Sequence, residues 1–332
     1  MKVLVTGIAG FIGFHVAKRL LDEGYSVVGF DNINDYYDVQ LKLDRLKELG
    51  VEEKDNQWKS SKCNLNFIKR DLLEMDVLMD LFRDEKFDYV VHLAAQAGVR
   101  YSLEAPQNYV DSNITGFLNI LECCRNYLVK HLVFASSSSV YGLNAKIPFS
   151  TEDRTDSPIS LYAASKKSNE LMAYTYSHLF KIPTTGLRFF TVYGPWGRPD
   201  MAMHLFTEAI FNGKPIKVFN EGKMSRDFTY VDDIVESITR VIAKAPGNKQ
   251  LPMNLFNIGN NNPEKLTDFI EEIESATQKT AIKEYFPMQA GDVEKTFADV
   301  QSLISYIDYK PKTAIKEGIG NFVNWYKNYY KI

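Results

Sequence analysis

The sequence predicts an α/β protein with a Rossmann-type doubly wound parallel sheet and a smaller, interleaved C-terminal substrate-binding lobe. Strand-like and helix-like patterns alternate five times before residue 135, which is typical of a parallel sheet covered by helices. A glycine-rich turn joins the first strand to its helix, as in nucleotide-binding units. After residue 190 short strands, loops and helices follow near 203–212, 231–245 and 265–275. We therefore expect domains at 1–190 and 191–332, with some later elements returning to the first.

Composition excludes several classes of function. The chain has 332 residues, of which 45% are hydrophobic and 24% charged, as in ordinary globular proteins. A net charge of −3 argues against a nucleic-acid partner. Cys63, Cys123 and Cys124 form neither a disulfide framework nor a metal-ligand pattern, so we expect a reducing cytoplasm and no metal. The N-terminus begins with an apolar strand, and we expect no signal peptide and no membrane segment.

The first strand and its turn form a dinucleotide-binding fingerprint. The apolar run Lys2–Thr6 leads directly into Gly7, Gly10 and Gly13, and a helical pattern covers 14–23. In this pattern the first glycine permits a tight turn, the second lets the backbone approach a pyrophosphate, and the third packs helix against strand. The start of the helix then offers N–H groups to the phosphates.

An acidic residue in the expected place specifies the nucleotide. The second strand, 26–30, ends in Asp31, eighteen residues after Gly13. A carboxylate there accepts hydrogen bonds from the adenosine ribose and repels a 2′-phosphate. The sequence therefore predicts NAD rather than NADP, and 1–190 becomes the NAD-binding domain.

The segment from 34 to 98 continues the alternation. We expect a charged surface helix at 41–49, a polar loop to 64, strands at 65–69 and 89–93, and a helix at 77–82. Asp71 and Leu72 follow the third strand, where they can meet the adenine. Small residues after the fourth strand, at 94–98, would let a cofactor lie against the strand ends. His92 lies inside that strand and is predicted to be a core histidine.

A serine run follows the next buried strand. We expect a helix at 109–128 that carries Asn113, then a strand at 131–135, and the run at 136–139 directly after it. Ligands bind at the carboxyl ends of strands in doubly wound sheets, so these serines are placed to contact one rather than to form a flexible loop. A sixth strand at 184–190 leads into a turn-rich loop at 191–199.

Tyr162 and Lys166 are the predicted catalytic pair. Ser160 can cap a helix, and 163–178 contains no proline or glycine, so the two side chains should lie one helical turn apart. A lysine cation near a phenol lowers the phenol pKa, which makes the tyrosine a general base near pH 7. Because the same spacing also occurs on solvated helix faces, the assignment depends on the surrounding motifs.

The combined pattern resembles the extended short-chain dehydrogenase/reductase family over essentially the whole chain, and within it the nucleotide-sugar epimerases. Five segments resemble UDP-glucuronate 4-epimerases, namely 31–38, 98–102, 160–164, 191–200 and 288–293. The resemblance implies an NAD-dependent inversion at C4 of a UDP-sugar through a transient 4-keto intermediate. Tyr162 would be the base, Lys166 would lower its pKa, and Ser137 would hydrogen-bond the sugar hydroxyl.

The resemblance also implies binding roles, residue by residue. The positions that match cofactor contacts are Gly7, Gly10, Phe11, Ile12, Gly13, Asp31, Asn32, Asp71, Leu72, Leu93, Ala94, Ala95, Asn113, Ser136, Tyr162, Lys166 and Phe189. The positions assigned to substrate are Arg100, Ser137, Ser138, Ser139, Thr191, Arg198, Phe219, Arg226 and Asp292. Arg226 would neutralise the UDP diphosphate, Phe219 would contact uracil, and Asp292 would lie near the uridine ribose.

Serines rather than carboxylates follow Ser137, which favours epimerisation. Related dehydratases and decarboxylases carry an acidic residue there, and Ser138 and Ser139 cannot replace it at neutral pH. We expect the serine run and Thr191 to hold the sugar carboxylate away from the orientation that releases carbon dioxide. The alternatives are a 4-epimerase of UDP-N-acetylglucosamine, of its uronic acid or of UDP-glucose, and a UDP-glucuronate decarboxylase.

Two further expectations concern class and assembly. A non-catalytic NAD-binding sensor would have no need of a base, a lysine, a serine and a diphosphate arginine together, so we favour an enzyme. As in the family, the helices at 109–128 and 163–178 would form a four-helix interface in a homodimer. A role in supplying surface-polysaccharide precursors rests on family analogy alone.

Overall fold

A computed structural model describes residues 1–288 and 293–332 in two compact units. The first unit comprises Met1–Asn144, Asp153–Arg188 and Val235–Phe256, and the second comprises Ala145–Glu152, Phe189–Ile234 and Asn257–Ile332. The chain therefore leaves the first unit and returns to it. In the described residues, no helix is both long and apolar enough to cross a membrane.

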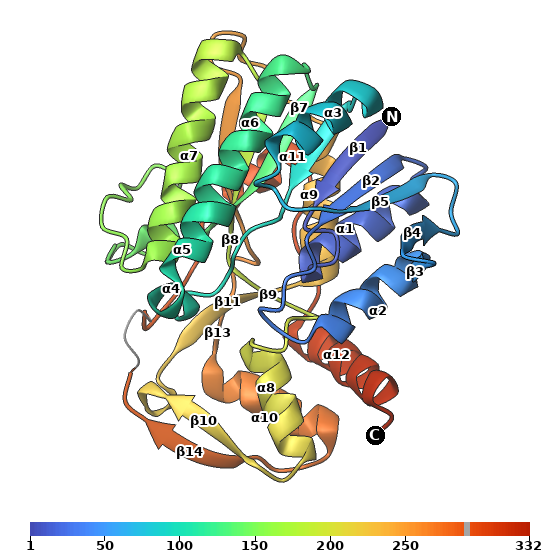
Figure 1. Cartoon of the computed structure of the whole chain (residues 1–332). Helices are drawn as coiled ribbons and strands as arrows, with labels where there is room; N and C mark the ends of the chain where they lie inside the picture. The colour runs from blue at the N-terminus through green and yellow to red at the C-terminus, as the bar shows by residue number, and fades with distance from the viewer. Residues whose placement is uncertain (289–292) are drawn as a thin grey trace. The chain divides into compact units, whose positions relative to one another are not determined.

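The first unit is built on a seven-stranded sheet with strand order β12-β8-β7-β6-β1-β2-β5 (Figure 1). The strands are β1 (Lys2–Thr6), β2 (Ser26–Asp31), β5 (Leu65–Lys69), β6 (Tyr89–His92), β7 (His131–Ser137), β8 (Thr184–Phe189) and β12 (Met253–Ile258). β1 pairs in parallel with both β2 and β6, so the chain reverses its direction of travel across the sheet there. This order confirms the predicted Rossmann-type fold, in which ligands bind near that reversal.

Helices α3 (Met75–Glu85), α6 (Gly116–Asn126) and α7 (Leu161–Phe180) cover one face of this sheet. Their apolar residues form one core with alternate residues of the strands, because successive strand side chains point to opposite faces. The cluster includes Leu4, Val90, Leu132 and Phe134 from strands, and Leu78, Phe82, Phe117, Ile120 and Ala173 from helices.

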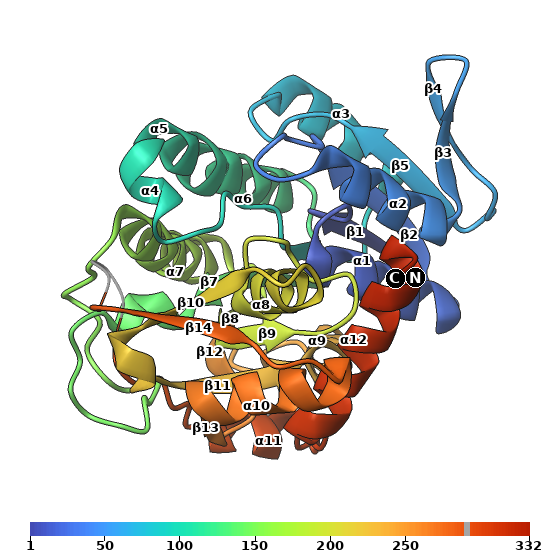
Figure 2. The same ribbon diagram turned by 90° about the horizontal axis from the view of Figure 1, so that it is seen from below.

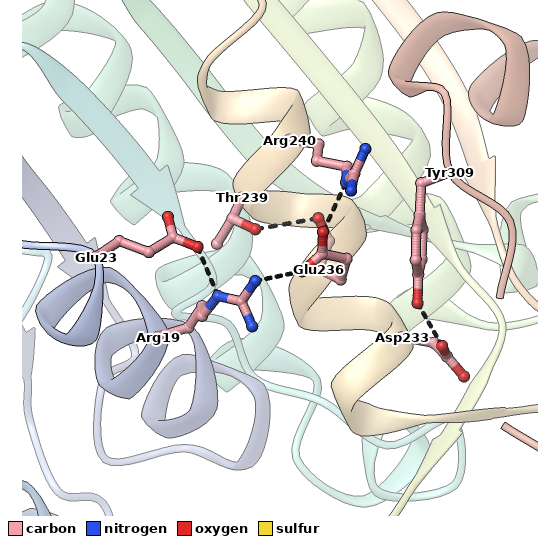
Figure 3. A network of polar contacts seen from close by, with 7 residues as sticks. All are labelled: Arg19, Glu23, Asp233, Glu236, Thr239, Arg240 and Tyr309. Carbon is pink, nitrogen blue, oxygen red and sulfur yellow. Dashed lines mark hydrogen bonds and ion pairs between the residues drawn. The ribbon is translucent and has the colours of Figure 1, made fainter. Parts of the chain in front are cut away.

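Within the first unit, an ion-pair network joins α1 (Phe11–Asp22) to the part of α9 (Val231–Ile242) that follows Ile234. Arg19 donates from Nε to Glu23 and from Nη2 to Glu236, both at 2.5 Å, and Glu236 also accepts from Arg240 (Figure 3). Arg19 is 44% exposed, so water and salt weaken each pair, and the shared geometry of several charges matters more than any one of them.

A β-hairpin replaces the predicted polar loop that follows α2 (Val39–Leu49). Strands β3 (Val51–Lys54) and β4 (Gln57–Ser60) pair in antiparallel register. Asp55 and Asn56 both have φ near +55°, which is the geometry of a two-residue hairpin turn that Asn and Asp tolerate. Trp58 packs its ring edge-on against Phe67 at 4.9 Å. The prediction of a polar loop was wrong because the charged residues of both strands obscure the turn signal of Asp55 and Asn56.

The predicted helix at 109–128 is divided by a π-helical turn. Helix α5 (Pro106–Tyr109) continues as a π turn at Val110–Thr115, and α6 begins at Gly116. A π turn contains one extra residue, and such turns are frequent at functional sites. Asn113 lies within it. Period-based sequence analysis cannot detect a single extra residue in an otherwise helical segment.

The described residues of the second unit form two small sheets that are accompanied by α-helices. Strands β9 (Thr191–Tyr193), β11 (Ser225–Tyr230) and β13 (Pro263–Lys265) form one sheet, and β10 (Pro215–Phe219) pairs in parallel with β14 (Ile282–Phe286). The helices are α8 (Ala202–Phe211), α10 (Leu266–Thr277), α11 (Gln301–Ile307) and α12 (Ile315–Tyr330), and Figure 2 shows α10 and α12 from below. Phe228 stacks on Phe269 with a ring-centroid separation of 4.1 Å, which places a core between β11 and α10.

Two helices of this unit, α11 and α12, were not predicted. Asp233 accepts the Tyr309 hydroxyl (Figure 3) and the Lys312 and Thr313 backbone N–H groups. This buried carboxylate therefore holds the segment between the two helices.

Candidate active site

The glycine turn after β1 has the close packing that a dinucleotide requires. Gly7 has φ +74°, and a Cβ there would lie 2.7 Å from the Ala94 backbone nitrogen. A Cβ on Gly13 would lie 2.0 Å from the Gly7 carbonyl oxygen, so the helix could not approach the strand. Gly10 is the N-cap of α1, so no cap side chain satisfies the N–H groups at the start of the helix, which are the groups that bind phosphate in such turns. This geometry fits the pyrophosphate of NAD.

Asp31 lies at the end of β2, and its carboxylate is tied to the glycine turn. It accepts from the Ala9 N–H at 3.0 Å and from the Ile33 N–H at 2.8 Å. Burial raises the Asp31 pKa, while these hydrogen bonds and the cations of Lys42 and Arg45 oppose that change. The side chain is thus placed in advance at the position predicted for the adenosine ribose.

Asn32 and Asp71, two further residues assigned to the cofactor, are in contact with each other. Asn32 Nδ2 donates to Asp71 Oδ2 at 2.8 Å. Leu72 is buried beside α6, and a Cβ on Gly116 would lie 2.9 Å from the Leu72 Cβ. The ends of β2 and β5 therefore bring these predicted adenosine contacts to one edge of the sheet.

Helix α2 contributes two buried cations that the sequence analysis placed on the surface. Arg45 is fully buried and donates to the Ala9 carbonyl at 2.9 Å and to the Tyr37 hydroxyl at 2.6 Å. Lys42 is 5% exposed and donates to the Asn34 carbonyl at 2.6 Å. The spacing of Leu41, Leu46 and Leu49 marks the apolar face to which these cations belong, and this signal could have revealed them.

The end of β6 supplies the small residues predicted at the cofactor. The Ala94 N–H donates to Thr6 Oγ1 at 3.2 Å, and the Leu93 N–H donates to the Thr6 carbonyl. Thr6 Oγ1 also lies 2.9 Å from His92 Nδ1. Burial, followed by the nearby Lys166 cation, lowers the His92 pKa to about 3, so this histidine is neutral at physiological pH. The prediction of a core histidine is confirmed.

Asn113 connects the end of β6 to α7. Its Oδ1 accepts from the Gln96 N–H at 2.8 Å, and its Nδ2 donates to the Gln96 carbonyl and to Ser165 Oγ, each at 3.0 Å. The Asn113 carbonyl accepts from Asn169 Nδ2. The π turn thus presents both the side chain and the backbone of this residue to α7.

The predicted catalytic pair lies at the start of α7. Ser160 Oγ accepts the Ala163 N–H at 3.1 Å and caps the helix, so Tyr162 and Lys166 fall one turn apart. Lys166 is 4% exposed and donates to the Ala135 carbonyl of β7 at 3.0 Å. Burial lowers the Lys166 pKa to about 8, so the ammonium persists at pH 7. The Tyr109 ring meets the Tyr162 ring edge-on at 6.1 Å.

The serine run turns away from the end of β7. Ser136 and Ser137 are its last strand residues, and a 3₁₀ turn covers Ser138–Tyr141. Ser137 Oγ accepts the Ser139 N–H at 3.2 Å, whereas the Ser136 hydroxyl donates to Glu170 at 2.7 Å. The serines therefore differ in role: Ser136 is engaged with α7, and Ser137 begins the turn. Arg100, assigned to substrate, is exposed where α4 (Tyr101–Glu104) begins.

The remaining predicted residues belong to the second unit. Phe189 and Thr191 lie at the end of β8 and the start of β9, and the Phe219 ring lies 5.7 Å from that of Phe286. Arg198 binds Asp200 through Nε and Nη2 at 2.9 and 2.7 Å. Arg226 Nη1 donates to the Ser225 and Glu294 carbonyls. Asp292 lies outside the described residues.

A buried carboxylate next to Arg226 was missed. Asp227 accepts the backbone N–H groups of Asn260, Asn261 and Ala298 at 2.7 to 3.1 Å. Burial raises the Asp227 pKa, and these hydrogen bonds oppose the change. The residue therefore holds the loop after β12 against β11. In the sequence it resembles an ordinary surface acid, and only its tertiary partners distinguish it. Among the described residues, no group of three or more His, Cys, Asp or Glu is arranged to hold a metal.

The chain is similar in sequence to a known family of enzymes and to individual proteins. Residues 3–259 match the model of the NAD dependent epimerase/dehydratase family. "Protein CapI" of Staphylococcus aureus is 54% identical over 344 residues, covering 100% of both chains. A "Probable UDP-glucuronate 4-epimerase" of Rhizobium meliloti is 48% identical, covering 100% of this chain and 98% of the relative.

A solved structure agrees with these relatives. It is the UDP-glucuronic acid 4-epimerase from Bacillus cereus, in complex with UDP-glucuronic acid and NAD. Its TM-score to this chain is 0.89 at 33% sequence identity, and the match covers 99% of this chain and 100% of that one. The similarity therefore extends over both units.

Proposed function

Because the chain belongs to the NAD-dependent epimerase/dehydratase family, we propose that it interconverts UDP-glucuronate and UDP-galacturonate by inversion at C4. The observation that carries the proposal is the catalytic pair: Tyr162 lies one turn from a buried Lys166 cation, in the unit that contains the glycine turn. Full-length similarity to proteins described as UDP-glucuronate 4-epimerases supports the choice of sugar.

Tyr162 performs the proton transfers. Its phenolate takes the proton of the C4 hydroxyl, and Lys166 stabilises that phenolate by its charge. When bound, NAD accepts the hydride from C4 and returns it to the opposite face. Tyr162 then gives the proton back to the C4 oxygen after the 4-keto sugar has rotated about its bonds to the diphosphate. Because the reaction has no net oxidation, the cofactor remains bound through turnover.

Ser137 and its neighbours orient the sugar. The Ser137 hydroxyl hydrogen-bonds the C4 oxygen beside the base, and Ser138, Ser139 and Thr191 bind the sugar carboxylate by neutral hydrogen bonds. A 4-keto uronic acid is a β-keto acid that loses carbon dioxide when its carboxylate stands perpendicular to the carbonyl plane. Holding the carboxylate out of that orientation favours epimerisation over decarboxylation. Arg226 neutralises the diphosphate, and Phe219 contacts uracil.

The chain acts as a homodimer in this proposal, with α6 and α7 of each copy forming four packed helices. Leu171, Tyr174 and Leu179 are 58%, 50% and 60% exposed on α7, and Leu118 is 38% exposed on α6. The spacing of the α7 residues places them on one face of the helix. An apolar helical face of this kind is typical of a protein–protein contact.

The test is to incubate the purified protein with UDP-glucuronate, without added NAD, and to follow the sugar nucleotides by NMR. We expect UDP-galacturonate to form, because NAD that copurifies with the protein supports the reaction. Formation of a UDP-pentose would instead mean decarboxylation. If UDP-glucose or UDP-N-acetylglucosamine were converted and UDP-glucuronate were not, the protein would be a 4-epimerase, but the proposed substrate would be wrong.

A further inference from the structure

A buried ion pair of Glu170 and Arg188 begins one helical turn after Lys166 on α7. The proposed reaction assigns it no role. Glu170 of α7 is 4% exposed and Arg188 of β8 is 2% exposed. Arg188 binds Glu170 through two hydrogen bonds, from Nε at 2.8 Å and from Nη2 at 2.9 Å. A fork of this kind is the strongest geometry for an arginine–carboxylate pair. Removing two charges from water costs free energy that their attraction often does not recover, so stabilisation of the fold does not by itself explain this pair.

The pair also bonds to the serine turn. Ser136 donates from Oγ to Glu170 Oε1 at 2.7 Å, and Arg188 Nη1 donates to the Tyr141 hydroxyl at 3.0 Å. Ser136 directly precedes Ser137, and Tyr141 ends the 3₁₀ turn that follows it. The ion pair therefore joins α7, β7, β8 and this turn by side-chain hydrogen bonds that are all buried.

On α7 the pair continues the line of catalytic residues. Tyr162, Lys166 and Glu170 are spaced four apart and so share one helix face. Lys166 bonds to Ala135 of β7, and Glu170 bonds to the next residue, Ser136. The register between helix and strand is thus fixed immediately before Ser137 and one turn after Lys166. Any slip of α7 along β7 would change the separation of Tyr162 and Ser137.

The charges of the pair cancel. Burial opposes the Arg188 charge, but hydrogen bonds and the negative charge of Glu170 outweigh it and raise the Arg188 pKa. Lys167 and Tyr141 contact the pair, the Tyr109 ring contacts the Tyr162 ring, and His92 interacts with the Lys166 cation. His92 is neutral, and Lys167, at 3.5 Å from Glu170, is partly exposed and screened. Lys166, one helical turn from Tyr162 on α7, is the cation that the proposed function assigns to the base.

We propose that Glu170 and Arg188 are positioning residues for the epimerase: they lock α7 to the serine turn and, as a neutral pair, leave Lys166 to govern the charge state of Tyr162. The inference rests on the proposed function of that tyrosine. It assigns the pair a role in rate and pH dependence, without contact with the substrate.

The charge balance is tested by Glu170→Gln, Arg188→Met and the double variant. Activity should rise with pH as the Tyr162 phenol ionises, and this acid limb is measured as kcat against pH. The excess positive charge in E170Q stabilises the phenolate and should move the limb to lower pH. The excess negative charge in R188M should move it to higher pH. Glu170 lies about 12 Å along the helix from Tyr162, so each shift should be roughly half to one pH unit. The neutral double variant should return to the wild-type position.

The positional role is tested by Ser136→Ala, which removes one bond and no charge. We expect kcat to fall about tenfold, with KM for the UDP-sugar and the acid limb unchanged. The matched control is Thr185→Val, which removes the buried 2.8 Å contact between Thr185 and His131 in the same two strands. It should lower the melting temperature but leave kcat and the acid limb at wild-type values.

The ionisation of Tyr162 can be measured without turnover by ultraviolet titration. The spectrum of Y162F is subtracted from that of wild type, and the spectrum of each charge variant that also carries Y162F is subtracted from that of the charge variant. Opposite shifts in the two single variants, reversed in the double variant, support the proposal. If the tyrosine ionises at the same pH in all four proteins, or if S136A has wild-type kcat, the proposal is overturned. If the single variants do not fold, S136A decides the proposal, because a wild-type kcat in S136A overturns it. A wild-type protein that epimerises no UDP-sugar contradicts the proposed function alone, because the titration still measures the charge effect.

Discussion

At the scale of single residues, Lys166 serves two opposing requirements. In the proposed mechanism its ammonium lies close to Tyr162 and stabilises the phenolate, yet its burial disfavours the charge and lowers its pKa from 10.5 to about 8. Because the folded-state pKa is below the unfolded value, the buried cation destabilises the fold below about pH 8. That destabilisation is relieved as the pH rises toward 10.5, where the unfolded chain also loses its proton.

Replacement of Lys166 by Met should separate these requirements. We expect kcat to fall by at least about 100-fold, because the phenol is no longer assisted. The NAD-free variant should be more stable than NAD-free wild type at pH 7, by no more than about 3 kcal/mol, because the desolvated charge is gone while one hydrogen bond is lost. Denaturant unfolding at pH 7 and pH 10 measures this. A variant that is less stable than wild type at pH 7 would contradict the burial argument.

Thr191 belongs to the same scale, since the role that we propose for it is a single hydrogen bond to the substrate. Thr191→Ala should reduce kcat/KM for UDP-glucuronate about tenfold or release some UDP-pentose, because the sugar carboxylate is held less firmly. NMR of the product mixture distinguishes the two effects. The control is Thr175→Ala on α7, whose hydroxyl bonds within its own helix and which should behave as wild type. Unchanged turnover without pentose in T191A would remove Thr191 from the proposal.

At the scale of elements, α7 depends on how it begins. Ser160 is in an extended conformation, and its Oγ satisfies one of the free N–H groups at the helix start, two residues before Tyr162. The π turn at Val110–Thr115 supports the same helix through Asn113 and Asn169. The cap residue Ser160 thus stabilises the start of α7, and the π turn that precedes α6 stabilises the same helix by hydrogen bonds.

Removal of the cap by Ser160→Ala should lower the free energy of unfolding by about 1 kcal/mol. It should also lower kcat severalfold, because the first turn of α7 carries Tyr162. Calorimetry and steady-state kinetics measure the two effects. Ser160→Asp, which retains a capping oxygen, should recover most of both. If S160A lost stability but kept wild-type kcat, the position of Tyr162 would not depend on the cap.

At the scale of the whole molecule, the proposed assembly depends on the exposed apolar face of α7. Leu171→Glu places a charge in the expected interface and should convert the dimer to a monomer, as measured by sedimentation equilibrium. The exposed Leu128 lies after α6 and outside this face, so L128E is the matched control and should remain dimeric. A wild-type protein that is monomeric at all concentrations would contradict the four-helix interface.

The sequence determined the order of strands and helices, the glycine turn, Asp31 and the Tyr162–Lys166 pair. These features depend on local patterns: apolar periodicity, glycine at a positive φ, and two side chains one turn apart. Each is specified by residues that are close together in the chain. The sequence did not predict the hairpin at 51–60, α11 or α12, where charged and aromatic residues obscure the periodicity.

Only the tertiary structure decided which polar residues are buried and with what partners. Glu170, Arg188 and Asp227 resemble surface charges in the sequence, because nothing nearby in the chain marks them as buried. The hydrogen-bond partners named above for these three residues lie 18 to 71 residues away. A buried charge is tolerated only where distant segments supply its hydrogen bonds, and that arrangement exists only once the chain has folded. The folded chain therefore determines the surroundings of the proposed catalytic pair.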